Sequence, residues 1–209
     1  MRRNLGGIVG LLALVMVSAC SNDAEPAGTG SSATPVVDET AANSRPTLTA
    51  PSLQPPAQEG RRVNKDRPDV VFDPCTWIRD ETIREAGFDP ASRERGEDFI
   101  AEWTFLICHF ESEVLDLSVM SGNVTLEEEV QKSQKTGPWQ QPIKVNGRDA
   151  TKGVDPEHPD VCEVNIRTAV GAVFVNQMLN LEGRAQGSDP CMGIEKTAAL
   201  IEQEIGEEN

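Results

Sequence analysis

The sequence predicts an α+β fold, an antiparallel sheet with flanking helices. Three observations lead to this prediction. Several short segments alternate apolar and polar residues, as β-strands do. Two helix-start signals, Asp73-Pro74-Cys75 and Asp189-Pro190-Cys191, stand before and after these segments. Four cysteines lie in the same part of the chain, where two disulfides would tie helix termini to strands.

Each Asp-Pro-Cys segment predicts a helix with aspartate as the N-cap and proline at the first helical position, where its missing N–H costs nothing. The first helix is expected to end at Gly87, with a break at Asp80. Its apolar residues are Trp77, Ile78 and Ile83. The last helix has apolar residues spaced four, three and four apart, which places them on one face: Ile194, Ala198, Ile201 and Ile205.

The strands are expected between these two helices. An apolar run from Glu102 to Glu111 predicts a central strand, and the alternating segment from Val114 to Met120 predicts its hairpin partner. Thr125 and Glu128 form a capping box that predicts a helix to about Lys135. A Glu128–Lys132 ion pair, at the i, i+4 spacing, would support this helix.

Two further hairpins are predicted. Asn146-Gly147 follows the alternating Ile143 and Val145, which is typical of a two-residue hairpin turn, and Ala150 would lie on the returning strand. Cys162, Val164 and Ile166 alternate with polar neighbours, and the segment from Ala172 to Leu179 would pair back on them.

The N-terminus predicts export. Arg2 and Arg3 precede an uncharged run of thirteen residues from Leu5 to Val17, which fits a signal peptide and is too short to span a bilayer. The run ends in Ser18-Ala19-Cys20, which resembles the lipobox of bacterial lipoproteins. That resemblance implies that residues 1–19 are removed and that the Cys20 thiol receives a diacylglyceryl group, with palmitate-type acyl chains. The alternative is an ordinary cleaved signal followed by a chance cysteine.

Two regions follow the signal. Residues 20–69 are rich in Pro, Ser, Thr and Ala, which predicts a lipidated N-terminus and a disordered tether. Residues 70–209 are expected to form a single extracytoplasmic domain. The chain carries 34 acidic and 19 basic residues, a net charge of −15. This acidity argues against nucleic-acid partners and against a basic patch for anionic lipids.

Cys75, Cys108, Cys162 and Cys191 remain once Cys20 is lipidated, an even number that favours disulfides in an oxidising compartment. Three connectivities are open. Pairing Cys75 with Cys108 and Cys162 with Cys191 closes the shortest loops and is the one we favour. No metal site and no cofactor are predicted, since the chain has no Cys-x-x-Cys and only two histidines.

No residue set predicts catalysis, and we expect no catalytic residues. His109 lies in the apolar run and is expected on the strand face opposite Cys108. His158 lies in the acidic segment 155–160, which could hold a divalent cation but is more typical of a solvated turn. Asn123-Val124-Thr125 is a glycosylation sequon whose use a lipobox argues against.

These features together resemble an actinobacterial family, of mycobacterial or nocardial type. Its members are cell-envelope lipoproteins catalogued only as a domain of unknown function. The resemblance rests on the lipobox, the tether, Asp73-Pro74-Cys75, the Val145-x-Gly147-x-x-Ala150 step and the four cysteines. It implies sequential disulfide pairing and attachment to the outer face of the cell membrane. It supplies no catalytic residues.

We therefore expect a lipid-anchored, non-enzymatic binding or interaction module, whose partner is an envelope protein. The alternative is a carrier that holds a small apolar ligand or lipid between the sheet and its helices. A hydrolase is the least favoured class, because the chain has no Gly-x-Ser-x-Gly and no Ser-x-x-Lys motif.

Overall fold

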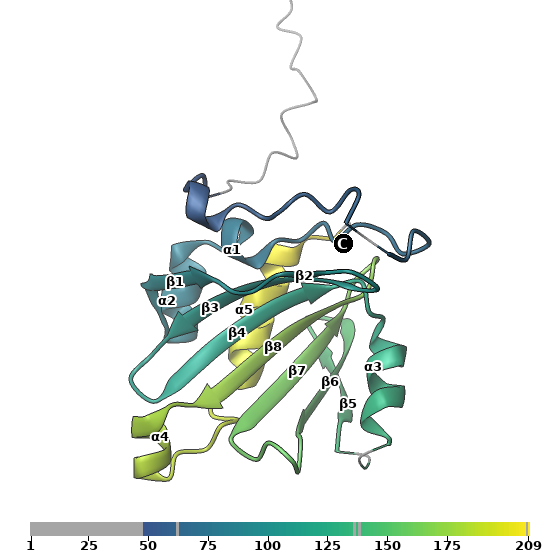
Figure 1. Cartoon of the computed structure of the whole chain (residues 1–209). Helices are drawn as coiled ribbons and strands as arrows, with labels where there is room; N and C mark the ends of the chain where they lie inside the picture. The colour runs from purple at the N-terminus through teal and green to yellow at the C-terminus, as the bar shows by residue number, and fades with distance from the viewer. Residues whose placement is uncertain (1–47, 62, 136, 138, 208) are drawn as a thin grey trace, which may run out of the picture. The chain divides into compact units, whose positions relative to one another are not determined.

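The computed structural model describes residues 48–61, 63–135, 137, 139–207 and 209. They form an eight-stranded antiparallel sheet with helices packed on it (Figure 1), so the predicted α+β class is confirmed. The strand order is β1-β3-β4-β8-β7-β6-β5, and β2 also pairs with β3. Within this part of the chain no helix is long and apolar enough to cross a bilayer.

The predicted hairpins are confirmed with small changes at their ends. The first joins β3 (Thr104–Glu111) to β4 (Leu115–Gly122). The second joins β5 (Gln141–Val145) to β6 (Arg148–Val154) through Asn146 and Gly147, which both have positive φ. The third joins β7 (Val161–Arg167) to β8 (Ala172–Leu179). Because β4 also pairs with β8, the first and third hairpins form the centre of the sheet.

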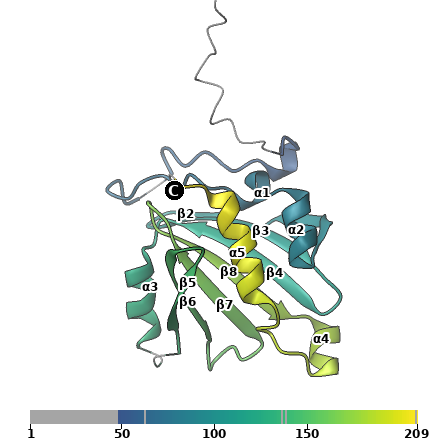
Figure 2. The same cartoon turned by 180° about the vertical axis from the view of Figure 1, so that it is seen from behind.

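One face of the sheet carries the main core. Helix α5 (Ile194–Ile205) lies across this face, as Figure 2 shows from behind. The four apolar residues predicted for its buried face are all fully buried. They pack on inward-facing strand residues: Leu117, Val119, Val164, Ile166, Val173 and Val175. The alternation in the strands and the helical spacing in α5 therefore describe the same interface.

The first Asp-Pro-Cys segment forms a helix as predicted. Asp73 accepts a hydrogen bond from the Cys75 backbone N–H and caps α1 (Pro74–Trp77). A break follows, and α2 (Asp80–Ala86) begins at the residue where the break was expected. It ends at Gly87, whose φ of 93° is the left-handed conformation that favours glycine.

The second Asp-Pro-Cys segment was wrongly assigned to the start of a helix. Asp189 again accepts from the N–H of the residue two further on, Cys191, but only a turn follows. Helix α5 begins at Ile194, after Gly193, which has a φ of 75°. A left-handed residue cannot continue a right-handed helix, so the turn and the helix stay separate.

Both favoured disulfides are present. Cys75 in α1 is bonded to Cys108 in β3, and Cys162 in β7 is bonded to Cys191 in the turn before α5. The first therefore ties a helix terminus to a strand, as predicted. The second ties the turn before α5 to a strand. Together they fix both helical ends of the domain to the central strands.

Helix α3 (Leu126–Ser133) has the predicted capping box, in which Thr125 and Glu128 hydrogen-bond each other's backbone N–H groups. The predicted Glu128–Lys132 pair is wrong. Glu128 binds Arg67 at 2.6 Å, and Lys132 lies 3.5 Å from Glu129. The arginine arrives from a segment 61 residues away, which no helical spacing could indicate.

Several elements had no sequence prediction: the 3-10 helix η2 (Pro51–Leu53), β1 (Asp89–Arg95), β2 (Phe99–Ile100) and α4 (Leu181–Gln186). Strand β1 lies at the sheet edge, contains Pro90 and has an irregular register with β3. Residues 48–61 and 63–69, which were expected in the tether, lie against the domain. Leu53 packs on the core, and its carbonyl accepts from Arg95.

The sheet face opposite α5 is only partly covered, and we call it the open face. Helix α3 packs against β7 on this side, and the strands from β3 to β7 are turned toward the viewer in Figure 1. A second, smaller apolar cluster lies here, formed by Val124, Ala172 and Phe174 with Phe105 and Met120 against them.

Candidate functional site

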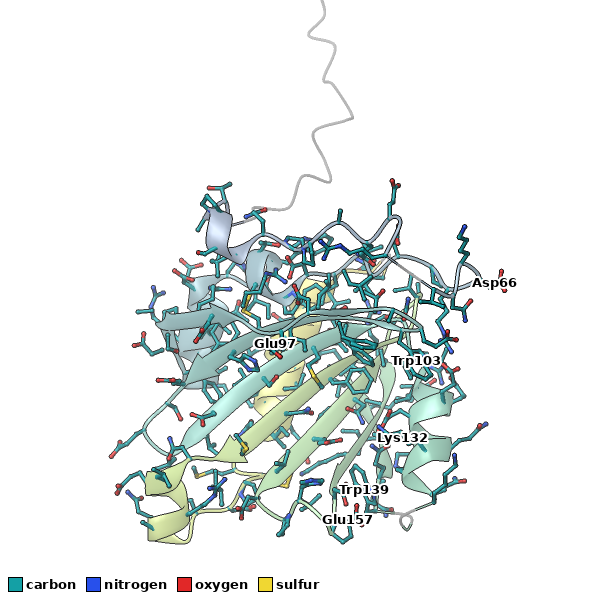
Figure 3. All side chains as sticks on the ribbon, viewed as in Figure 1. Asp66, Glu97, Trp103, Lys132, Trp139 and Glu157 are labelled. Atoms are coloured by element: carbon teal, nitrogen blue, oxygen red, sulfur yellow. A yellow bond between two sulfur atoms is a disulfide. The ribbon has the colours of Figure 1, made fainter. Side chains whose placement is uncertain are left out.

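The open face contains a pocket of about 300 Å³ between the sheet and α3, which we call the sheet-face pocket. Figure 3 shows Trp103 and Lys132 near the border between α3 and this face. Strands β2, β3, β4, β7 and β8 and helix α3 contribute the residues that line the pocket: Phe99, Phe105, Ile107, Met120, Glu129, Lys132, Glu163, Phe174 and Asn176. Most of the lining is therefore apolar, with four polar side chains.

The aromatic wall depends on a glycine. Phe105 in β3 is directly opposite Gly122 in β4, and a Cβ at Gly122 would lie 2.7 Å from the Phe105 ring. The missing side chain leaves room for this ring to cover the strand. The centroid of the Phe174 ring lies 5.8 Å from that of Phe105. Two rings thus stand side by side in the pocket wall.

Glu163 is the principal polar group of the pocket. It lies on β7 between two core residues, so the strand's alternation points its side chain to the open face, where its ladder partner is Asn176. Burial, and to a lesser extent the negative charges of Glu129 and Asp155, raise its pKa to about 6. Lys132 and the Asn165 amide act in the opposite direction without cancelling these effects.

The other polar groups of the pocket differ in how well they are paired. Glu129 has Lys132 at 3.5 Å, so this carboxylate has a cation beside it. The Oδ1 atom of Asn176 is buried and accepts no hydrogen bond from the described residues. An unpaired buried acceptor costs free energy, and a ligand that donates a hydrogen bond would recover it.

A second hollow of about 570 Å³ lies between α3 and the β5–β6 hairpin. Its floor is apolar, with Leu126, Val130 and Ile143 among the lining residues. The charged groups at its rim pair with one another, since Arg167 binds both Glu127 and Asp149. Because these charges already have partners, the sheet-face pocket is the stronger candidate for recognising a polar group.

The candidates named from the sequence lie elsewhere. Cys20, the predicted lipidation site, is outside the described residues, and the other four cysteines are in disulfides. His109 is exposed on the open face, opposite the buried Cys108 as predicted, and does not line the pocket. Asn123 of the sequon is 1% exposed, and its amide donates to the Pro68 carbonyl and accepts from a backbone N–H.

The acidic segment 155–160 forms a turn. Asp155 accepts from the Glu157 N–H, and the His158 ring lies 3.4 Å from the same carboxylate, with its side chain 69% exposed. In the part of the chain that the structure describes, no three or more His, Cys, Asp or Glu side chains are arranged to hold a metal ion. The arrangement is that of an exposed turn.

Residues 15–204 match the model of a family described as "Protein of unknown function (DUF3558)". The chain belongs to the DUF3558 family. The match spans most of the chain, including both disulfides and the pocket. No curated protein and no solved structure shows significant similarity to the chain. The DUF3558 description gives no activity, so the function has to be argued from the geometry of this chain.

Sequence reasoning missed the sheet-face pocket of this DUF3558 protein. The polar residues Glu163 and Asn165 that alternate with the apolar residues of β7 indicated a solvent-facing side of the strand. What buries Glu163 is α3, together with aromatic residues from β3 and β8. A carboxylate between the apolar residues Cys162 and Val164 was the available signal, but it does not reveal which helix covers it.

Proposed function

We propose that this protein is a lipid-anchored, non-enzymatic binding module of the outer face of the cell membrane, and that it holds its ligand in the sheet-face pocket. The pocket is the observation that carries the proposal. It combines apolar walls with a few convergent polar groups, which is the usual composition of a small-molecule site. The core between α5 and the sheet is filled by buried side chains, whereas the open face has this pocket.

Binding is favoured over hydrolysis because of how the pocket's acids are placed. A carboxyl with a raised pKa, such as Glu163, could serve as a general acid. However, the second carboxylate, that of Glu129, lies beside Lys132, and neither of the chain's two histidines lines the pocket. The site thus lacks an unpaired second group to complete an acid–base pair.

The anchor is supported by the sequence at residues 14–20 and by the disulfides, which suit an exported protein. Expression of the full chain in a bacterium that processes lipoproteins tests it. Intact-mass analysis of the membrane fraction should give a polypeptide that begins at Cys20 and carries a diacylglyceryl group. Cys20→Ala should leave the precursor uncleaved or release the protein to the medium, whereas Ser21→Ala should change nothing. Unchanged membrane fractionation and lipid labelling of Cys20→Ala would refute the anchor.

Native mass spectrometry of the mature protein from envelope extracts tests the binding site. A bound small molecule should appear as added mass. Asn176→Phe should abolish this mass by filling the pocket, and Met178→Phe, on the same face of β8 but outside the pocket, should retain it. A ligand that is lost equally from both variants, or retained by both, would place binding elsewhere on the protein. The protein mass alone, in extracts and in the purified protein, would count against a binding module.

A further inference from the structure

The polar groups of the sheet-face pocket are mainly hydrogen-bond acceptors. Glu163 presents a carboxylate, and Asn176 presents an amide oxygen without a donor among the described residues. The single cationic side chain in the lining is Lys132. Its ammonium lies beside Glu129 at the rim, and its side chain is 76% exposed. A positively charged ligand with hydrogen-bond donors would therefore complement the Glu163 carboxylate and the Asn176 amide oxygen.

The charges around Glu163 leave an excess of negative charge. From α3 it faces Glu129 and Lys132, and from the turn before β7 it faces Asp155. The lining residues from β2, β3, β4 and β8 are uncharged: Phe99, Phe105, Ile107, Met120, Phe174 and Asn176. The two carboxylates of the lining therefore meet one ammonium, which leaves room for one further positive charge.

The remaining walls suit the apolar part of such a ligand. The Phe105 and Phe174 rings stand in the wall beside the carboxylate, and Phe99, which is 49% exposed, forms part of the rim. Aromatic rings attract cations through their negative faces, and they also bury hydrocarbon. A pocket of about 300 Å³ is at the small end of ligand sites, which limits the ligand to a small molecule.

We propose that the sheet-face pocket binds a small organic monocation, an alkyl- or arylalkylammonium. Its ammonium group contacts Glu163 and Asn176, and its hydrocarbon lies against Phe105 and Phe174. This inference rests on the proposed binding function and gives its ligand a chemical class. Charge complementarity selects this class over anions, which Glu163 would repel. It is also favoured over purely apolar molecules, which would leave the Asn176 oxygen without a donor.

Calorimetric titration of the mature protein with phenethylammonium at pH 8 tests the inference. Phenethyl alcohol serves as the neutral analogue and phenylacetate as the anionic one. The ammonium should bind at least tenfold more tightly than either. Glu163→Gln should remove most of this preference, whereas Glu157→Gln, which changes an exposed carboxylate outside the pocket, should retain it. Equal affinity for the alcohol and the ammonium, or unchanged ammonium binding by Glu163→Gln, would overturn the inference.

Two further measurements test whether negative charge in the pocket determines the affinity for the ammonium. At pH 5 about a tenth of the Glu163 side chains remain ionised, so ammonium affinity should fall about tenfold from its value at pH 8. Lys132→Gln should raise the affinity several-fold, because it removes the cation that competes for the carboxylates. A pH-independent affinity, or weaker binding by Lys132→Gln, would overturn the inference.

The outcomes also distinguish this inference from the proposed function. If the alcohol or the phenylacetate binds in the pocket and Asn176→Phe blocks it, the binding module stands and the cationic ligand is refuted. If none of the three probes binds and the native spectra contain only protein, both proposals fail together.

Discussion

At neutral pH the ionised Glu163 side chain should destabilise the folded domain. Glu163→Gln should therefore increase the free energy of unfolding. Glutamine keeps the shape of the side chain and removes the charge that burial disfavours. Its amide could also donate to the buried Asn176 oxygen, which has no donor among the described residues. A pKa raised from 4.5 to about 6 corresponds to a cost of about 2 kcal/mol for the ionised group in the folded state.

The pH dependence follows from the direction of this change. The folded protein holds the Glu163 proton more tightly than the unfolded chain, so ionisation opposes folding. The cost is absent below about pH 4.5, grows between pH 4.5 and 6, and is fully present above pH 6. For a domain of this size about 2 kcal/mol corresponds to roughly 4 to 8 °C in melting temperature.

Thermal unfolding of the wild type and Glu163→Gln from pH 4 to pH 8 measures this effect. The two proteins should melt together at pH 4, and the variant should melt higher at pH 8. Glu157→Gln is the control, since its carboxylate is exposed and should give a constant offset. If the difference between the wild type and Glu163→Gln does not change with pH, or if the variant is the less stable at pH 8, the assignment of Glu163 as a buried, uncompensated acid is wrong.

Three other perturbations test the rest of the fold. Dithiothreitol should lower the melting temperature by more than roughly 10 °C, because two disulfides that close loops of 33 and 29 residues are lost; an unchanged value after confirmed reduction would contradict this. Arg67→Ala should cost no more than about 1 kcal/mol at pH 7, since Glu128 is 42% exposed. Arg67, together with the hydrogen bonds from Thr125, lowers the pKa of Glu128 to about 2. The deficit should therefore shrink in urea titrations as pH falls from 4.5 toward 2, and a constant deficit would refute this. Glu204→Ala should lower the free energy of unfolding in urea by about 2 kcal/mol, because the buried Thr82 hydroxyl and the Arg79 guanidinium lose this acceptor. A loss below about 0.5 kcal/mol would contradict that role.

The central strands and α5 could be predicted because local sequence and tertiary burial agree there. Each residue predicted for the core face of β4 and α5 is buried, since a period of two or of 3.6 places these residues against one another. The Asn146-Gly147 turn was predictable for a local reason too, because both residues tolerate positive φ.

Strand β1 could not be predicted in this way. Its sequence, Asp-Pro-Ala-Ser-Arg-Glu-Arg, has no apolar alternation. It is a strand because it pairs with β3 and because its arginines bind distant carboxylates, Arg93 with Asp80 and Arg95 with Asp73. These contacts depend on the tertiary structure and leave no local pattern.

The pocket was unpredictable for the same reason. Glu163, Asn176 and Phe105 come from three strands, and they meet only because of the β3-β4-β8-β7 order and because α3 lies over one end of the open face. The sequence predicted each of these strands and the helix. It did not predict the strand order or the face on which the helix packs, and those two facts create the site.

Both ends of the sheet are poorly suited to accept another strand. The edge strand β5 contains Pro142, and β1 at the opposite edge contains Pro90 together with an irregular register. Proline has no N–H to donate, and a bulged strand twists away from a straight partner. Copies of this protein crowded at high local concentration should therefore resist the strand-to-strand association that leads to β-aggregates.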